Sequence, residues 1–339
     1  YNHTGRKLPI NFSPITFGSW MGGDRDGNPF VTFKTTKEVI LLSRWMAANL
    51  YEKEITKLIQ DLSMHDCSAN FRKLVGKTSE PYRVYLRPIR NKMKNTQKII
   101  ELHLNERRKL NDSLLVKSID ELIEPLNIVY NSLVSVKCNI IANGSVLDLL
   151  RRAYAFGLNL AKVDIRQNSS RHTHLINSIC KYKNIGNYEE WDEKKKIKFL
   201  NINFRSKDSL SINKIKINKI DKETWSTFQM LNTIPSECLG AYVVSMASSV
   251  SDILAVMLLQ KEAGLNKYLR VVPLFETLSD LNKANVVIKN LYEISWYLKY
   301  FKNSQEVMIG YSDSSKDAGK FAASWSIYCV QEELQKVSK

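Results

Sequence analysis

The first half of the chain repeats its apolar residues at the spacing of an α-helix. Between residues 34 and 62, apolar side chains recur at i, i+3 and i+4, which predicts one long amphipathic helix. The same spacing predicts helices over residues 80–110, 115–137 and 145–156. We therefore expect residues 1–157 to form a mainly helical region, which also carries the loop GGDRDGNP near its start.

From about residue 158 the pattern changes to short, continuous apolar runs, each followed by a helical stretch. Strands are predicted at 160–166, 241–247, 269–276 and 306–313. The helices predicted after them cover 169–182, 251–263, 279–291 and 322–337. Apolar strands that alternate with helices favour parallel pairing in a sheet that is covered on both faces.

Two architectures are compatible with this alternation. A doubly wound open sheet would be expected to carry a glycine-rich phosphate turn after its first strand, and neither of the usual motifs of that kind occurs. Four strand–helix units with polar strand ends instead suggest about half of a (β/α)8 barrel. We predict a helix-rich α/β chain in which residues 158–339 form an incomplete barrel of the TIM type, preceded by a large α-helical portion at 1–157.

Composition narrows the class of protein. With 339 residues and 44% hydrophobic content, the chain is long enough to bury a large core. No apolar run approaches the roughly 20 residues of a membrane span, and the first residues lack the features of a signal peptide. The five cysteines are scattered singly, without the spacing of a zinc site or a disulfide framework. These features predict a soluble protein of the reducing cytoplasm that makes no contact with a membrane.

The formal net charge of +16 raises nucleic acid and anionic membranes as partners to consider. The excess is mostly lysine, spread over helical faces and the polar segment 206–223 rather than gathered with aromatic residues into a stripe. A general enrichment in lysine explains this distribution best, and a basic surface that collects anions is the second interpretation. Binding of nucleic acid is not expected.

Polar side chains cluster where the predicted strands end. In chain order, the four strand ends offer Asp164, Arg166 and Gln167; then Ser245; then Glu276 and Thr277; then Ser312, Asp313, Ser314 and Lys316. Barrel enzymes carry their catalytic groups at this end of the strands, so the cluster predicts a site.

The two acids Glu276 and Asp313 are separated by 313 − 276 = 37 residues, about one strand–helix repeat, so neighbouring strands would bring them together. Such a pair suits Mg²⁺, which takes one or two carboxylates and completes its shell with water and substrate oxygens. Arg166 could bind phosphate or carboxylate through its planar guanidinium, and Lys316 could stand beside a transferred phosphate. As alternatives, the acids could be ordinary surface or capping residues, and Lys316 a solvated residue of a helix's first turn. Arg166 could instead form a buried ion pair with Asp164 or Glu276.

A second candidate is the glycine-rich segment FGSWMGGDRDGNPFVT at 17–32, with its triplet Asp24, Arg25 and Asp26. It predicts a tightly turned loop whose backbone N–H groups could face a ligand, and a solvent-exposed turn held by local contacts is an equal alternative. The histidines are weaker candidates, expected in surface or capping positions, so the chain offers no evident general base. They are His3, His65, His103, His172 and His174.

Six blocks of the chain resemble, in the same order, blocks of bacterial-type phosphoenolpyruvate carboxylase. They are FGSWMGGDRDGNPFVT at 17–32, IIANG at 140–144, VDIRQNSSRHT at 163–173, AYVVSMASSVSDILAVMLLQKEAG at 241–264, VVPLFETLSDLNKANVV at 271–287 and VMIGYSDSSKDAG at 307–319. They extend over nearly the whole chain, and DRDGNP and GYSDSSKDAG are the most specific.

The resemblance implies an enzyme that carboxylates phosphoenolpyruvate with bicarbonate to oxaloacetate and phosphate. The reaction passes through carboxyphosphate and an enolate that Mg²⁺ or Mn²⁺ stabilises. Members of the family supply oxaloacetate to the citric acid cycle, as cytoplasmic homotetramers under allosteric control, on a barrel decorated with helices.

By matching position, the resemblance also assigns the site residues. The metal ligands are expected to be Glu276 and Asp313, the catalytic residues Arg166 and Lys316, and the substrate-binding residues Arg166, Gln167 and Arg25. Three residues depart from the family pattern: Asn168 where glutamate is expected, Val250 where proline is usual, and Phe30 where a polar or basic side chain is common.

Two parts of the family's machinery do not occur in these 339 residues: a catalytic histidine in an upstream block similar to TAHPTE, and a downstream phosphate loop similar to GRGG. The chain also begins without methionine, and its last helical pattern lacks a residue that ends helices. We therefore expect a central fragment of the carboxylase that is inactive by itself. The remaining hypotheses are another barrel enzyme that uses phosphoenolpyruvate or pyruvate, and a binding protein that has lost catalysis.

Overall fold

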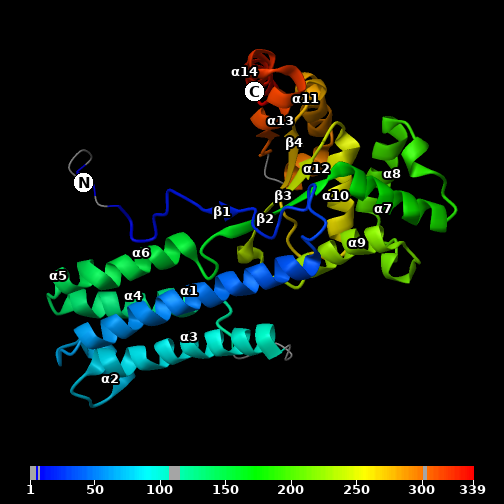
Figure 1. Cartoon of the computed structure of the whole chain (residues 1–339). Helices are drawn as coiled ribbons and strands as arrows, with labels where there is room; N and C mark the ends of the chain where they lie inside the picture. Colours follow the sequence, from blue (N-terminus) through cyan, green and yellow to red (C-terminus); the bar gives the residue numbers. More distant parts are fainter. Residues whose placement is uncertain (1–4, 7, 107–114, 301–303) are drawn as a thin grey trace. The chain divides into compact units, whose positions relative to one another are not determined.

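The computed structural model describes residues 5–6, 8–106, 115–300 and 304–339 (Figure 1). The chain divides into two compact units, residues 1–18 with 38–162 and residues 19–37 with 163–339. The loop GGDRDGNP therefore belongs with the second unit, although it precedes the helices of the first unit in sequence. None of the helices in the described ranges is both long and apolar enough to cross a membrane.

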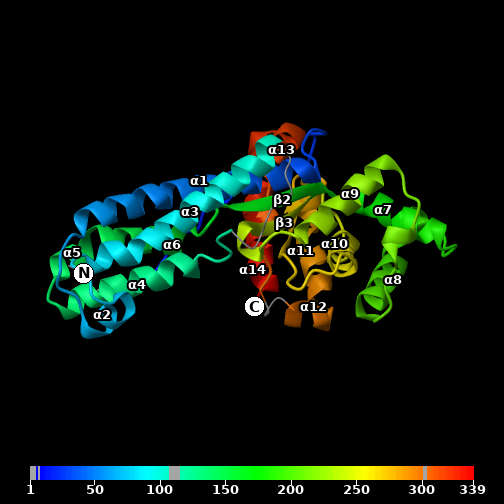
Figure 2. The same ribbon diagram turned by 90° about the horizontal axis from the view of Figure 1, so that it is seen from below.

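The first unit is helical, and its long helices lie side by side (Figures 1 and 2). They are α1 (Phe33–Asp61, most of which belongs here), α3 (Pro81–Glu106), α4 (Asp120–Ser135) and α6 (Leu147–Phe156). Shorter pieces are α2 (Ala69–Val75), α5 (Asn139–Ile141) and the π-helical η2 (Ala142–Val146). Each long helix turns its apolar face to one shared core, which includes Tyr82, Phe71 and Leu86.

Most helices of the first unit agree with the prediction from periodicity. The helix predicted over 34–62 is confirmed as α1, and the one predicted over 80–110 is described as far as Glu106. The remaining positions of that prediction, 107–110, lie outside the described residues. The helix predicted over 115–137 is shorter, because α4 begins only at Asp120, where Asp120 and Glu121 favour a helix start.

The second unit is built on a parallel sheet. The strands β2 (Lys162–Asn168), β3 (Leu239–Ser245), β4 (Val271–Phe275) and β5 (Met308–Ile309) pair in parallel in this order, with β1 (Gly18–Ser19) next to β2. A helix follows each strand from β2 onward: α7 (Ser169–Tyr182), α10 (Val250–Glu262), α11 (Leu278–Tyr292) and α13 (Tyr311–Ala318), which continues into α14 (Lys320–Val337). The prediction of a helix-rich α/β chain with a parallel, incomplete barrel is thus confirmed as a five-stranded half-barrel.

Several elements between β2 and β3, and one after α11, were missed by the sequence pattern. They are η3 (Tyr188–Glu190), α8 (Glu193–Arg205), η4 (Ile212–Lys214), α9 (Lys219–Leu231), η5 (Ser236–Cys238) and α12 (Ser295–Tyr300). Helix α10 begins slightly earlier than predicted, because Ser249 and Asp252 form a capping box at its start.

The strand register decides which side chains share a face of the sheet. Arg166 lies level with Val243, and Ile165 with Tyr242. Val243 in turn lies level with Val272 on β4. Because side chains alternate along a strand, Arg166 and Val243 point to one face, and Ile165 and Tyr242 point to the other.

The strand predicted over 306–313 is wrong beyond Ile309. The Gly310 N–H donates to the Phe275 carbonyl at 2.9 Å, and this is the last backbone hydrogen bond from this segment to β4. A helix begins at the next residue, Tyr311. The Ser314 hydroxyl donates back to the Gly310 carbonyl at 2.7 Å, as side chains in a first helical turn do. Asp313 therefore lies in the first turn of α13 rather than at the end of a strand.

Candidate functional site

The glycine-rich loop is joined to β2 by backbone hydrogen bonds. The Arg166 N–H donates to the Gly23 carbonyl at 2.9 Å, and the Arg25 N–H donates to the Arg166 carbonyl at 2.9 Å. Gly23 is required here, because a Cβ at this position would lie 1.9 Å from the Asp164 carbonyl oxygen. This close approach places Asp24 and Asp26 beside the Arg166 side chain.

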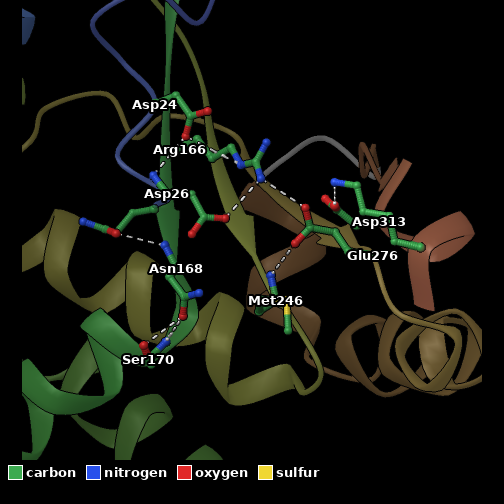
Figure 3. A network of polar contacts seen from close by, with 10 residues as sticks. Asp24, Asp26, Arg166, Asn168, Ser170, Met246, Glu276 and Asp313 are labelled. Carbon is green, nitrogen blue, oxygen red and sulfur yellow. Dashed lines mark hydrogen bonds and ion pairs between the residues drawn. The ribbon is translucent and has the colours of Figure 1, made fainter. Parts of the chain in front are cut away.

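Arg166 is the centre of a cluster of charges (Figure 3). Its Nη2 donates to Asp26 Oδ2 and to Glu276 Oε1, each at 3.1 Å, and its Nε lies 3.7 Å from Asp24 Oδ1. The Trp20 ring covers the guanidinium, with 5.1 Å between the ring centroid and the guanidinium carbon. Of the alternatives open at the level of sequence, the ion pair with Glu276 is therefore realised in this structure.

Asp164 is not a partner of Arg166 in this arrangement. Its Oδ1 accepts the Ala241 N–H at 2.7 Å, and its Oδ2 accepts the Trp20 indole N–H at 3.2 Å. Asp164 thus ties β2 to β3 and to the loop.

Glu276 directly follows β4 and is buried, with 4% of its surface exposed. Its Oε2 accepts the Met246 N–H at 3.1 Å. Burial is the main cause that raises the pKa of the Glu276 carboxyl; the bond from Met246 and the charge of Arg166 act against it, and the carboxylates of Asp26 and Asp313 add to it. The charge of Asp313 therefore reaches Glu276.

Asp313 and Lys316 lie on α13 and pair with each other, with 2.9 Å between Lys316 Nζ and Asp313 Oδ1. In Figure 3 Glu276 lies between Arg166 and Asp313. The structure thus brings the two predicted metal ligands, Glu276 and Asp313, to the same end of the half-barrel, where Glu276 contacts Arg166. Lys316 is mostly exposed and bonds only to Asp313 among the residues that the structure describes.

The donor atoms of this cluster are suited to a hard divalent cation. Four carboxylates, from Asp24, Asp26, Glu276 and Asp313, face two basic groups, from Arg166 and Lys316. The formal excess is two negative charges, and two carboxylates are enough for Mg²⁺, which keeps water in its shell. In the described ranges, no three His, Cys, Asp or Glu side chains converge to hold a metal, so the pair Glu276 and Asp313 would share a cation with water and substrate oxygens.

The other two predicted substrate residues, Arg25 and Gln167, do not join this cluster. The Arg25 side chain is buried and turns into its own loop, where Nη1 donates to the Gly23 carbonyl at 2.8 Å and Nη2 to Thr36 Oγ1 at 2.5 Å. Burial lowers the pKa of the Arg25 guanidinium. Gln167 points to the sheet face opposite Arg166. Arg25 and Gln167 both border a separate pocket.

The three departures from the family pattern have simple structural positions. Asn168 caps α7, because its Oδ1 accepts the Ser170 N–H at 3.0 Å. Val250 is buried at the start of α10, and Phe30 is largely exposed.

The expectation of a surface or capping role is wrong for His172. This residue is fully buried, and its Nε2 lies 2.8 Å from the Tyr242 hydroxyl. The helical period places His172 on the face of α7 that packs on Tyr242 and Phe228, and burial lowers the pKa of its imidazole from 6.5 to about 3. His174, by contrast, is exposed and lies 2.5 Å from Glu189.

The fold and the cluster define a class of protein: α/β barrel proteins with acidic and basic groups gathered at the carboxyl ends of parallel strands. A family model described as phosphoenolpyruvate carboxylase matches residues 1–339. Proteins of that name are 45% identical over 335 residues in Psychromonas ingrahamii, 45% over 349 residues in Acinetobacter baylyi and 45% over 333 residues in Vibrio vulnificus. The chain belongs to the phosphoenolpyruvate carboxylase family.

These alignments cover 98%, 100% and 98% of this chain, but 38%, 39% and 38% of the respective relatives. The chain therefore spans about two fifths of the length of the relatives it matches.

Proposed function

We propose that the chain is a central part of a phosphoenolpyruvate carboxylase, which converts phosphoenolpyruvate and bicarbonate into oxaloacetate and phosphate through carboxyphosphate and an enolate. The observation that carries the proposal is the position of Glu276 beside both Arg166 and Asp313 at one end of the half-barrel. Membership of the family over the whole chain supports it independently.

Arg166 is the residue we assign to the phosphoryl group. Its Nη2 serves both Asp26 and Glu276, while Nη1 makes no hydrogen bond to any described residue and Nε is buried without a hydrogen-bond partner there. The guanidinium therefore keeps donors for the oxygens of phosphoenolpyruvate or carboxyphosphate. The carboxylates around it hold it in place before the substrate arrives, which lowers the cost of ordering the site.

Glu276 and Asp313 are the residues that would hold Mg²⁺ or Mn²⁺. When bound, the cation supplies Lewis-acid stabilisation of negative charge that develops on the substrate. Lys316, three residues after Asp313 on α13, places a second positive charge near the same end, where it can approach the transferred phosphate. The assignment of Arg25 and Gln167 to substrate binding stays a prediction.

We further propose, from the family alone, that the half-barrel is part of a TIM-type (β/α)8 barrel in a full-length protein. That protein would act in the cytoplasm as an allosteric homotetramer and supply oxaloacetate to the citric acid cycle. The residue that moves protons would then come from outside this chain, so we expect these 339 residues to form no oxaloacetate by themselves.

The proposal is tested with Asp313→Asn in a full-length protein that contains this chain. Loss of one carboxylate weakens the hold on the cation, so we expect oxaloacetate formation at limiting Mg²⁺ to fall about a hundredfold or more, with partial recovery at high Mg²⁺. The rate is measured by coupling oxaloacetate to malate dehydrogenase.

Asp192→Asn is the matched control. Asp192 caps α8 through a bond from the Lys195 N–H, and asparagine caps equally well, so this variant should keep the wild-type rate. An Asp313→Asn enzyme with an unchanged rate and unchanged Mg²⁺ dependence would contradict the assignment.

A further inference from the structure

A second pocket lies beside the carboxyl end of β2. It has a volume of about 240 Å³ and is formed by the glycine-rich loop, the last residues of β2 and the start of α7. Its lining consists of Arg25, Asp26, Gly27, Gln167, Asn168, Ser170, Arg171 and His174. This volume is too small for a large cofactor and suits a small ligand.

The pocket shares Asp26 with the Arg166 cluster, but the side chains of Gln167 and Arg166 point to different faces of the sheet. Gln167 is level with Val244 on β3, whereas Arg166 is level with Val243, so their side chains point in opposite directions. The face of Gln167 is also the face of Tyr242, which packs on α7 through His172. Gln167 therefore faces the helix layer, away from Glu276.

Neither of the two arginines of the pocket forms an ion pair with a described residue. Arg25 is 7% exposed, forms no ion pair with any described residue, and its Nε has no hydrogen-bond partner among them. Arg171, in the first turn of α7, makes neither a hydrogen bond nor an ion pair to residues in the described ranges. The carboxylates of Glu223 and Asp24 act on the buried Arg25 without forming an ion pair with it, so an anion in the pocket would be attracted by both arginines.

Neutral donors and the helix end add to this positive environment. The side-chain oxygen Oε1 of Gln167 accepts the Asn168 N–H at 3.0 Å, and the side-chain nitrogen Nε2 donates to no described residue. The pocket lies at the N-terminus of the 14-residue helix α7, whose first N–H groups and dipole favour an anion.

Little negative charge opposes an anion in this pocket. Asp26 is the one acidic residue among the described residues that line the pocket. Its carboxylate forms an ion pair with Arg166 at 3.1 Å. His174 is held by Glu189 and contributes less to the pocket.

We propose that this pocket is a second anion site, which binds a phosphate group through Gln167 and Arg171, with the buried positive charge of Arg25 behind them. The Arg171 guanidinium and the Gln167 amide can share the oxygens of one phosphate, and the space left over admits a few attached atoms, as in a small phosphate monoester. This site goes beyond the proposed function, because it uses neither the carboxylate pair nor Arg166.

The test is a calorimetric titration of the chain with inorganic phosphate, in low salt and with EDTA so that no divalent cation is present. Without a cation the Arg166 cluster carries excess negative charge and repels phosphate, so the second pocket should give a single binding event. Arg171→Gln should weaken this binding about tenfold or more, as expected for the loss of a charged hydrogen bond.

Two matched variants give the comparison. Arg151→Gln makes the same change at an exposed position on α6 and should bind phosphate as the wild type does. Gln167→Glu keeps the size of the side chain but places a carboxylate at the pocket, so it should abolish binding. It also serves as the second test if Arg171→Gln fails to fold, which circular dichroism would reveal.

Two results would overturn the proposal. One is an absence of phosphate binding by the wild-type chain, or equal binding by wild type and Gln167→Glu. The other is a loss of binding in Lys316→Gln that equals the loss in Arg171→Gln, because the anion would then sit at the Arg166 cluster. No turnover is measured, so these outcomes are separate from a failure of the proposed carboxylase function.

Discussion

The buried imidazole of His172 should make the stability of the second unit depend on pH. Tyr242 supplies its contact at 2.8 Å, Phe228 packs at its edge, and Nδ1 has no hydrogen-bond partner among the described residues. A proton on this ring would place a charge in an apolar layer, where Arg25 also acts on Tyr242 as a positive charge. The folded chain therefore resists protonation of His172.

The sign and the size of the effect follow from the two pKa values. Burial lowers the pKa of His172 from 6.5 in the unfolded chain to about 3 in the folded chain. Between these values the unfolded chain binds a proton that the folded chain does not, so the free energy of unfolding falls as the pH falls. The slope is about half of 1.36 kcal/mol per pH unit at pH 6.5 and approaches about 1.36 below it, so the change from about pH 7 to about pH 4.5 is about 2.5 kcal/mol.

The assay is urea unfolding of wild-type chain and His172→Gln at several pH values between about 4.5 and 7, because glutamine can still bond to Tyr242 but cannot be protonated. Tryptophan fluorescence is a suitable probe, since five of the six tryptophans lie in the second unit: 20, 191, 225, 296 and 325. The wild type should lose about 2.5 kcal/mol more than His172→Gln over this range. His65→Gln, at an exposed position, controls for the substitution itself. Parallel pH profiles for wild type and His172→Gln would refute the reasoning.

Two further substitutions each test a contact within one of the two units. Gly23→Ala should lower the free energy of unfolding of the second unit by about 2 kcal/mol or more, because the new Cβ meets the Asp164 carbonyl at 1.9 Å and Val163 at 2.8 Å. Urea unfolding measures this loss, and wild-type stability would show that the loop moves away from β2 at no cost. Tyr51→Phe should cost the first unit about 1 kcal/mol, because the hydroxyl donates to the Gly157 carbonyl at 2.7 Å. Thermal unfolding followed by far-ultraviolet circular dichroism checks this second value, and an unchanged melting temperature would contradict it.

Local patterns predicted most of the regular structure. The apolar period of residues 34–62 was enough for α1, and the continuous apolar runs were enough for β3 and β4. These elements bury one face or both faces, so their hydrophobic positions repeat at the period of the structure. The pattern failed after Ile309, where serines that bond back to the preceding carbonyls begin a helix.

The site could be predicted in part, where its residues follow the spacing of one strand–helix unit. The spacing of Glu276 and Asp313 gave their position at one end of the half-barrel, because one strand–helix unit separates them. No local feature gave the burial of His172, since a histidine on an amphipathic helix is compatible with either face until its neighbour on the sheet is known. That neighbour is Tyr242, 70 residues further along the chain.

The sequence by itself determined the kinds of groups available, the elements that carry them and the family to which the chain belongs, because these depend on residue identity and local spacing. Only the tertiary structure decided how the charges are shared. It brought Asp26 of the loop and Glu276, which follows β4, to the same nitrogen of Arg166, and it left Arg25 buried in its own loop beside a separate pocket. Those contacts join residues more than a hundred positions apart, so they depend on strand register and on the close approach of the loop at Gly23, which no local pattern records.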